Sequence, residues 1–180
     1  MQVTGEALRS LRISMTTTDR FIVRHATASD GEDIARLEGI CFPEAEAASP
    51  KDILERVRTY PEHFTLVVSD CEIISVVNGP VTVGKDLEDH MYHDVSCHDA
   101  LGSWQMIFGV ETHPSYQRMG VASLAMTSFL EYARSLGLKG AVLTCKKELI
   151  SYYERFGFIN EGVSSSVHGG AVWYQMRAIF

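Results

Sequence analysis

One short segment restricts the folds open to this chain more than any other: a strand pattern passes into a helix pattern through a bend that contains glycine. Residues 105–112 (QMIFGVET) have the composition of a buried strand. From Val121 onward, apolar side chains recur at helical spacing until Gly137 ends the helix. Between them, residues 117–122 (QRMGVA) leave the first N–H groups of the helix without intrahelical partners. With the helix dipole, those groups form a site for an anion, most naturally a phosphate.

Three residues of the bend fit that interpretation. Gly120 allows backbone and ligand to approach closely, Ala122 keeps the turn uncrowded, and Arg118 adds a charged contact. A plain strand–turn–helix connection is the alternative, because the hexapeptide alone is a weak signal. The bend lacks the lysine of a nucleoside triphosphate loop and the three glycines of a dinucleotide fingerprint. Nucleoside triphosphates and NAD are therefore not the expected ligands.

The charge of the whole chain is compatible with a local anion site, because peptide dipoles supply the positive end. The formal net charge of -7 argues against a surface for nucleic acid or for an anionic membrane. A length of 180 residues with 46% hydrophobic content is the profile of one globular domain. Four widely spaced cysteines without a CxxC pair indicate free thiols, and no apolar run reaches the about 18 residues of a membrane span. We therefore expect a cytoplasmic protein.

Start signals mark two helices in the N-terminal half. Ser29 and Glu32 form a capping box that opens the first helix. Ser49 and Pro50 are the N-cap and first residue of a second helix, which ends before Pro61. Alternating or continuous apolar runs predict the strands. The expected strands outside the opening segment are Phe21–His25, Thr65–Ser69, Glu72–Val77, Ala141–Cys145, Phe158–Val163 and Ala171–Arg177.

These elements predict one α+β domain over residues 21–180, with a mixed, mostly antiparallel sheet and helices on both faces. The strands near residues 65–77 form a hairpin that residues 78–80 (NGP) end. Residues 81–103 form an acidic connection long enough to be functional or mobile, and Glu148–Arg155 is a short helix. Residues 1–20 are polar and weakly patterned, so we interpret them as a disordered N-terminal extension.

Two motifs in combination resemble the GNAT superfamily of N-acetyltransferases. The first is Pro-x-Tyr-Gln-x-x-Gly-x-Ala at residues 114–122, between a strand and a helix. The second is Tyr-Tyr-Glu-Arg-Phe-Gly-Phe at residues 152–158, on a short helix that follows a strand. The resemblance covers residues 21–180. The chain is similar in particular to the serotonin (arylalkylamine) N-acetyltransferases. In that branch a Pro-Glu, an Asn-Gly and a Leu-Thr-Cys motif occur in the same order.

The resemblance implies acetyl-coenzyme A (acetyl-CoA) as co-substrate. In this family the bend holds the pyrophosphate, and the preceding strand hydrogen-bonds the pantetheine arm. The implied cofactor-binding residues are Val110, Glu111 and Thr112 on the strand, and Gln117, Arg118, Met119, Gly120, Val121, Ala122 and Ser123 in the bend.

The resemblance also implies a catalytic residue. Tyr153 matches the tyrosine that faces the thioester sulfur, and we predict that it protonates the departing thiolate. On its sequence pattern alone, Tyr153 is more often a core aromatic on a short amphipathic helix, and the resemblance favours the catalytic role. Cys145 stands at a strand end where it could attack the thioester, although a cysteine within an apolar strand is more often an inert core thiol.

The chain departs from the branch at the proton acceptor. The branch's two strand histidines match Met106 and Phe108 here, and neither side chain takes a proton. The base therefore lies elsewhere, or the amine arrives neutral. Histidine titrates in the useful pH range, and acidic and histidine residues crowd residues 89–99. The candidates are His93, Asp94, His98 and, as a secondary candidate, His168.

The same crowded segment raises the question of a metal site. On a helix, His90, Asp94 and Cys97 or His98 would share one face, which is ligand-like spacing. Zinc spacings are usually cleaner, and the acidic and histidine side chains of a loop are commonly solvated. No metal is therefore expected.

The sequence thus predicts an acetyl-CoA-dependent N-acetyltransferase that transfers the acetyl group directly to a primary amine, such as a small arylalkylamine. Residues 42–49 match the mobile loop over the amine site in the branch, where Glu44 or Glu46 would attract a cationic amine or remain solvated surface charges. A protein N-terminus or lysine is an alternative acceptor, and a CoA-binding sensor without catalysis is an alternative function. Neither nucleic acid nor membrane is an expected partner, and a homodimer is left open.

Overall fold

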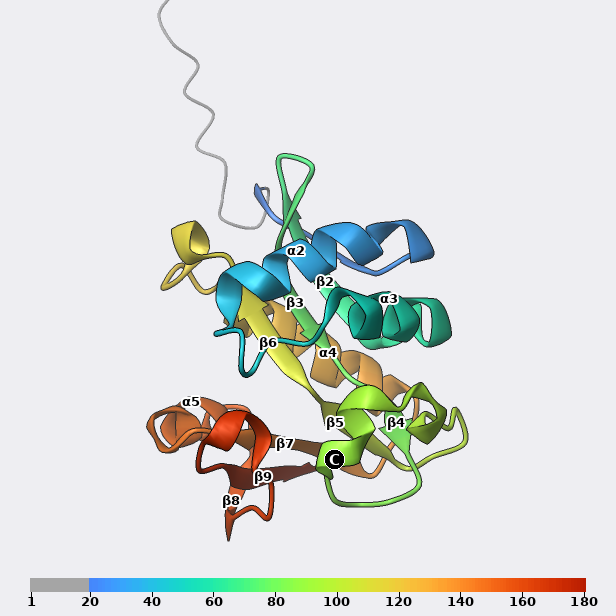
Figure 1. Ribbon diagram of the computed structural model, residues 1–180, viewed down its shortest axis with the longest axis vertical. Helices are drawn as coiled ribbons and strands as arrows, with labels where there is room; N and C mark the ends of the chain where they lie inside the picture. The colour runs from blue at the N-terminus through green and yellow to red at the C-terminus, as the bar shows by residue number, and fades with distance from the viewer. Residues whose placement is uncertain (1–19) are drawn as a thin grey trace, which may run out of the picture.

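The computed structural model describes residues 20–180, which form two adjoining β-sheets with helices packed on them (Figure 1). Of the extension expected at residues 1–20, all but Arg20 lies outside the described residues. The first sheet has the strand order β1-β2-β3-β6 and is antiparallel. Its strands are β1 (Ile22–His25), β2 (Phe64–Ser69), β3 (Glu72–Asn78) and β6 (Gly109–Thr112).

The second sheet has the strand order β4-β5-β7-β9-β8 and lies below the first in Figure 1. Strands β5 and β7 run parallel, whereas the other pairs of this sheet are antiparallel. The predicted α+β class with mixed, mostly antiparallel strands is therefore confirmed. The strands are β4 (Val81–Thr82), β5 (Trp104–Ile107), β7 (Gly140–Cys145), β8 (Ile159–Val163) and β9 (Tyr174–Ile179).

The prediction of one continuous strand at residues 105–112 is wrong, because the structure divides this segment into β5 and β6 at Phe108. Strand β6 pairs with β3, while β5 pairs with β7 in the other sheet. Pairing resumes beyond Asn78, since Met106 N–H donates to the backbone oxygen of Pro80 at 2.8 Å and Val81 pairs with Gln105. The two sheets separate because β7 pairs with β5 and not with β6, so β6 keeps one edge without a partner strand among residues 20–180.

Helices cover both faces of the first sheet, as predicted. Along the adjacent strands β2 and β3, Leu66 and Val76 belong to the apolar cluster under α2 (Gly31–Cys41) and α3 (Pro50–Thr59). Their neighbours in sequence, Val67 and Val77, pack instead in the cluster that includes α4 (Val121–Ser135). Alternate strand residues point to opposite faces, so this division places α4 behind the sheet and α2 and α3 in front (Figure 1).

The cap predicted for α3 is confirmed, because Ser49 Oγ accepts the N–H of Asp52 at 3.1 Å. The capping box predicted for the first helix is wrong by two residues. Thr27 N–H donates to the carboxylate of Asp30 at 2.7 Å, and a 3₁₀ turn precedes α2. Arg24 also binds this carboxylate through two contacts of 2.7 and 2.8 Å, which fixes Asp30 as the capping residue.

The remaining connections position the site. The β2–β3 hairpin turns through Asp70 and Cys71, both left-handed, with φ of 49° and 66°. Within the acidic connection, 3₁₀ turns form at Asp89–His93 and Val95–Cys97. The helix expected after β7 consists of a 3₁₀ turn followed by α5 (Ile150–Glu154). Among the described residues, no helix has the length and apolar character needed to span a membrane.

Candidate active site

The bend between β6 and α4 forms the wall of a cavity of about 280 Å³. Gly120 has a φ of 82° and Arg118 a φ of 62°, so two left-handed residues shape the turn. A Cβ added to Gly120 would meet no atom within 4 Å, which leaves the space above the helix N-terminus open. Seven of the ten predicted cofactor-binding residues line this cavity: Thr112, Gln117, Arg118, Gly120, Val121, Ala122 and Ser123.

The charges around this cavity suit an anion. Arg118 and Arg155 both line it, and no carboxylate does among the described residues. The N-terminus of the fifteen-residue helix α4 adds unpaired N–H groups and the positive end of a dipole. Gln117 anchors the bend to β6, since its side-chain amide donates to the backbone oxygen of Thr112 at 3.2 Å.

The structure places the other three predicted residues elsewhere. Val110 lines a second cavity, and Met119 is 44% exposed outside both cavities. The side chain of Glu111 is buried near α2. Its backbone oxygen accepts the Ser75 hydroxyl at 2.5 Å within the β3–β6 ladder, so the predicted contact of Glu111 with pantetheine stays a prediction.

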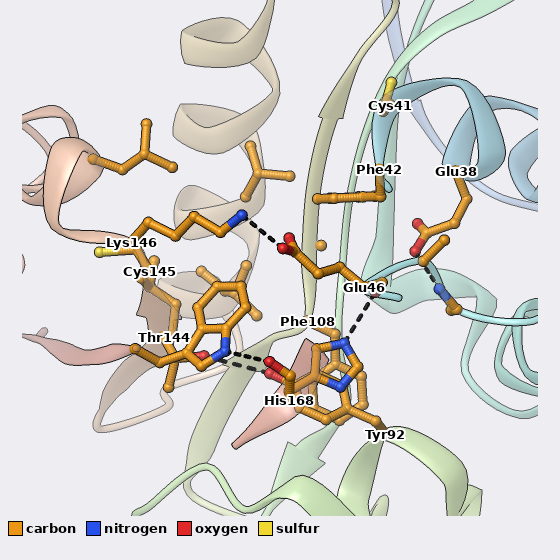
Figure 2. Close-up of a pocket in the computed structure, with 18 of the residues that line it drawn as sticks. Glu38, Cys41, Phe42, Glu46, Tyr92, Phe108, Thr144, Cys145, Lys146 and His168 are labelled. Atoms are coloured by element: carbon orange, nitrogen blue, oxygen red, sulfur yellow. Dashed lines mark hydrogen bonds and ion pairs between the residues drawn. The ribbon is translucent and has the colours of Figure 1, made fainter. Parts of the chain in front are cut away.

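The second cavity measures about 250 Å³ and opens between β6, the end of β7 and the loop after α2 (Figure 2). Val110 lines this cavity and Thr112 lines the first one. Residues two apart on a strand share a face. The two cavities therefore follow one another along β6, at its unpaired edge.

One side of the second cavity is held by an interlocked polar group (Figure 2). Lys146 Nζ lies 2.7 Å from Glu46 Oε1, and Lys146 also lies 5.7 Å from the ring centre of Trp173. His168 Nε2 donates to the backbone oxygen of Glu46 at 3.0 Å, because a carbonyl only accepts. Of the predicted amine-attracting residues, Glu46 lines the cavity but is already paired, and Glu44 is exposed outside it.

The opposite side contains two buried carboxyl groups. Glu38 of α2 lines the cavity and is 5% exposed, and Glu111 of β6 is 1% exposed. Ala48 N–H donates to Glu38 Oε1 at 2.7 Å, and the Asn78 side-chain amide donates to Glu111 Oε1 at 3.2 Å. Burial, followed by the neighbouring carboxyl group of Glu38, raises the pKa of Glu111 well above its ordinary value.

Tyr153 lies where the second cavity meets α5, and is 7% exposed. Burial raises the pKa of its phenol above the usual value, so the hydroxyl stays protonated at neutral pH. Cys145 lines the same cavity, and burial raises the pKa of its thiol to about 11. This environment supports a proton donor at Tyr153 and disfavours a thiolate nucleophile at Cys145.

The predicted base candidates separate in space. His93 and His168 line the second cavity, whereas Asp94 and His98 do not. His93 lies on its exposed rim and contacts Asp52 at 3.1 Å. The Asp94 carboxylate caps a 3₁₀ turn by accepting the N–H of Ser96.

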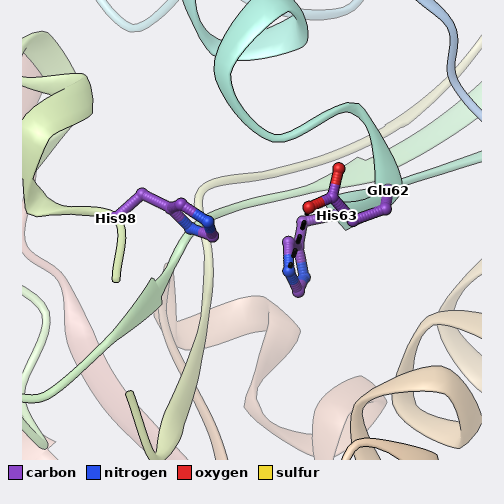
Figure 3. A group of neighbouring side chains, drawn as sticks. All are labelled: Glu62, His63 and His98. Carbon is purple, nitrogen blue, oxygen red and sulfur yellow. Dashed lines mark ion pairs between the residues drawn. The ribbon is translucent and has the colours of Figure 1, made fainter. Parts of the chain in front are cut away.

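His98 instead belongs to a group with Glu62 and His63 (Figure 3). The ligand atoms of the three residues lie within 4.8 Å of one another. His98 Nδ1, however, accepts the N–H of Val81 at 3.2 Å, so neutral His98 carries its proton on Nε2. A metal on Nε2 would displace the proton to Nδ1, and Nδ1 could then no longer accept the N–H of Val81. His98 can therefore bind a metal only if this hydrogen bond breaks. Hydrogen bonding and ring packing therefore explain the group.

The two positions that match the branch's histidines also have different surroundings. Met106 is fully buried in an apolar cluster with Leu87, Met91 and Val142. Phe108 lines the cavity, and the guanidinium of Arg56 lies 4.9 Å from its ring centre.

Sequence reasoning missed Glu38 and Glu111 as a pair, and also Arg56, Tyr92 and Lys146, all of which help to build the cavity. One signal was present: Glu38 falls at helical spacing with Ile34 and Leu37, on the buried face of α2. A carboxylate on an apolar face points to a buried partner or a site.

A model of the acetyltransferase (GNAT) family matches residues 32–158. This match covers most of the chain, and the chain therefore belongs to the GNAT acetyltransferase family. The match identifies the family and does not support the serotonin branch in particular.

Solved structures share this fold at low sequence identity. The GphF GNAT-like decarboxylase in complex with isobutyryl-CoA is 18% identical with a TM-score of 0.75, over 88% of this chain and 98% of that one. The ribosomal-protein-S18-alanine N-acetyltransferase from Escherichia coli is 12% identical with a TM-score of 0.63, over 88% and 93%. The PaiA N-acetyltransferase from Thermoplasma acidophilum, in complex with coenzyme A, is 11% identical with a TM-score of 0.65, over 89% and 99%.

Proposed function

We propose that this protein is an acetyl-CoA-dependent N-acetyltransferase that acts on a small primary amine. The observation that carries the proposal is the edge of β6 that has no partner strand among residues 20–180, along which the cavity at the bend leads to a second cavity with polar and aromatic walls. CoA has the same sequence of parts: a pyrophosphate, an amide-containing arm and a thioester.

Each part of acetyl-CoA has a matching partner. The pyrophosphate would lie on the N-terminus of α4 beside Arg118 and Arg155. The pantetheine amides would pair with the free edge of β6, as an added strand does. The acetyl group would then reach the second cavity beside Val110 and Tyr153.

The second cavity supports a small acceptor. Its volume of about 250 Å³ is below the roughly 300–1,000 Å³ typical of sites for drug-sized ligands. Rings of Phe42, Tyr92, Phe108 and Trp173 line it, which suits an amine with an apolar or aromatic body. A protein N-terminus or lysine is the alternative acceptor.

The reaction we propose is direct transfer without an acyl-enzyme. Holding the amine and the thioester at attack geometry supplies about 7 kcal/mol or more of the rate enhancement. Backbone N–H groups at the β6 edge would polarise the acetyl carbonyl. The Tyr153 hydroxyl would give its proton to the departing CoA thiolate and regain one from the amine nitrogen.

The test is CoA release from acetyl-CoA with a panel of aromatic amines, polyamines, amino acids and peptides, followed by mass spectrometry of the products. Acetylation of small aromatic amines in preference to peptides supports the proposal. Preference for a peptide would move the acceptor to a protein. CoA binding without turnover on any amine would favour the sensor.

One observation favours a second candidate function. Arg56 and Lys146 line the acyl end of the site, and Arg56 would attract the carboxylate of a malonyl-type acyl group, whereas Lys146 is already paired with Glu46. A structural neighbour is named as a GNAT-like decarboxylase. Release of carbon dioxide from malonyl-CoA in the absence of any amine would establish this activity, and intact malonyl-CoA would exclude it.

A further inference from the structure

We propose that the carboxyl pair Glu38–Glu111 accepts the proton of the substrate ammonium, with Glu38 as the catalytic base and Glu111 as its positioning residue. The inference rests on the proposed N-acetyltransferase function. It supplies the base that Met106 and Phe108, at the positions of the serotonin branch's strand histidines, do not provide.

The contacts of Glu111 favour its protonated form. Its Oε1 accepts the Asn78 amide, but its Oε2 has no hydrogen-bond donor among the described residues. The carboxyl group of Glu38 is the neighbouring charge that raises the pKa of Glu111, and α2, which carries Glu38, packs against β6. Two ionised carboxylates in contact repel each other, and a buried acceptor without a donor is costly. A proton on Glu111 Oε2, donated to Glu38, removes both costs.

A cation and a thiol lie next to the carboxyl pair. Arg56 of α3 is the cation that acts on Glu111, and it lowers the pKa of Glu111 less than burial and Glu38 raise it. Cys41 of α2 also lies beside the pair, and burial raises the pKa of its thiol to about 11. Cys41 is therefore neutral, and the pair carries one proton and one negative charge.

The carboxyl pair can be reached from the second cavity through Glu38. Glu38, Cys41 and Gly109 all line it, and the Glu38 carboxyl group points toward it (Figure 2). A Cβ on Gly109 would lie 2.5 Å from Glu111 Oε1 and 2.9 Å from the Asn78 side-chain nitrogen. Any side chain at residue 109 would therefore displace the pair. Gly109 begins β6, whose edge carries the acyl arm in the proposed function, so the pair lies next to the acyl group.

The proton balance of the step is complete. The ammonium gives one proton to the Glu38 carboxylate, and the free amine forms the C–N bond to the acetyl carbon. The C–S bond then breaks, and the thiolate gains a proton through Tyr153 in exchange for the second proton of the nitrogen. Glu38 finally releases its proton to solvent through the cavity. After the first transfer both carboxyl groups are neutral, which is the state that a buried site favours.

The experiment compares pH–rate profiles of Glu38→Gln, Glu111→Leu and Glu111→Gln with the wild type. Glu38→Gln should lower kcat/KM at least tenfold near neutral pH, and its rate should then rise tenfold per pH unit with the free-amine fraction. Glu111→Leu should cause a similar loss, and Glu111→Gln should recover most of it, because the amide N–H replaces the acid O–H as a donor to Glu38. Glu32→Gln, on the exposed side of the same helix, is the matched control and should behave as wild type.

A second measurement does not need turnover. Infrared spectra at neutral pH should show the carbonyl band of an un-ionised carboxylic acid in wild type, and Glu111→Gln should lack it. Missing bands, or a Glu38→Gln enzyme with wild-type rate and pH profile, would overturn the inference while leaving the acetyltransferase function intact. An acidic limb that disappears in His168→Ala would do the same by locating the base at His168. A wild type that acetylates no amine would instead remove the proposed function and the base with it.

Discussion

Tyr152 and Tyr153 are consecutive on α5, yet they line different cavities. Their ring centres are 5.1 Å apart and their planes meet at 80°. Tyr153 faces the second cavity, where the acyl group is expected, and Tyr152 faces the cavity at the bend. The buried hydroxyl of Tyr152 has no hydrogen-bond partner in the described part of the chain. One turn of helix thus offers a hydroxyl to each end of the proposed co-substrate.

This relationship gives the first prediction. Tyr153→Phe should lower kcat at least tenfold with nearly unchanged KM for acetyl-CoA, since positioned proton transfer contributes about 10²–10⁴-fold. Tyr152→Phe should leave kcat within about threefold. It should also stabilise the ligand-free protein by about 1 kcal/mol, because it removes an unsatisfied buried hydroxyl. Steady-state kinetics and thermal unfolding measure both. Near-normal kcat in Tyr153→Phe would reduce Tyr153 to a core aromatic.

The second prediction concerns the bend. CoA at 100 times its dissociation constant should stabilise the fold by about 2.7 kcal/mol, and Gly120→Glu should abolish that gain by placing bulk and negative charge in the pyrophosphate site. Gly137→Glu is the matched control, because Gly137 ends the same helix with a φ of 73° and equally open space. Both variants carry similar backbone strain, so only the response to CoA should differ. A full CoA shift in folded Gly120→Glu would contradict the site.

The third prediction is that Cys145 plays no covalent role. With a pKa of about 11, roughly one thiol in 10⁴ is ionised at pH 7. Cys145→Ala should keep kcat within about threefold. Mass spectrometry after brief iodoacetamide treatment should find Cys71, which is exposed, labelled well before Cys145. Trapping of an acetylated Cys145 peptide would refute direct transfer.

The fourth prediction links the carboxyl pair to stability. Because the pKa of Glu111 is raised in the folded state, the folded protein holds a proton that the unfolded chain releases above about pH 4.3. The stability from this proton is fully present below that pH and is lost as the pH rises through the folded pKa. Glu111→Gln cannot ionise. Its free energy of unfolding should therefore improve relative to wild type between about pH 5 and pH 8, as chemical denaturation measures. A constant difference across that range would show that Glu111 is ionised in the fold.

Much of the fold could be predicted from the sequence because its signals are local. The caps at Ser49 and Gly137 and the apolar spacing of α4 depend on neighbours within a few residues. The capping box failed because Ser29–Glu32 and Thr27–Asp30 are similar local patterns. The choice between them depended on Arg24, whose side chain reaches Asp30 from β1.

In the candidate site, too, local features could be predicted from the sequence and contacts between distant segments could not. The bend at the start of α4 is a continuous segment, so the sequence could predict that residues 117–123 lie together around one cavity, although Met119 turned outward. The second cavity is assembled from distant segments: Glu38 and Glu111 are brought together by α2 packing on β6. No spacing in the sequence indicates that these two residues lie close together in the fold.

The sequence by itself determined the α+β class, the helix and strand periods, and the glycine bend at the start of α4, because these depend on backbone preferences and on the spacing of apolar residues. Only the tertiary structure decided that residues 105–112 divide at Phe108, because that depends on which partner each half finds in a different sheet. It also decided that the pKa of Glu111 is raised. Burial and a facing carboxyl group determine that property, and both arise only when the chain has folded.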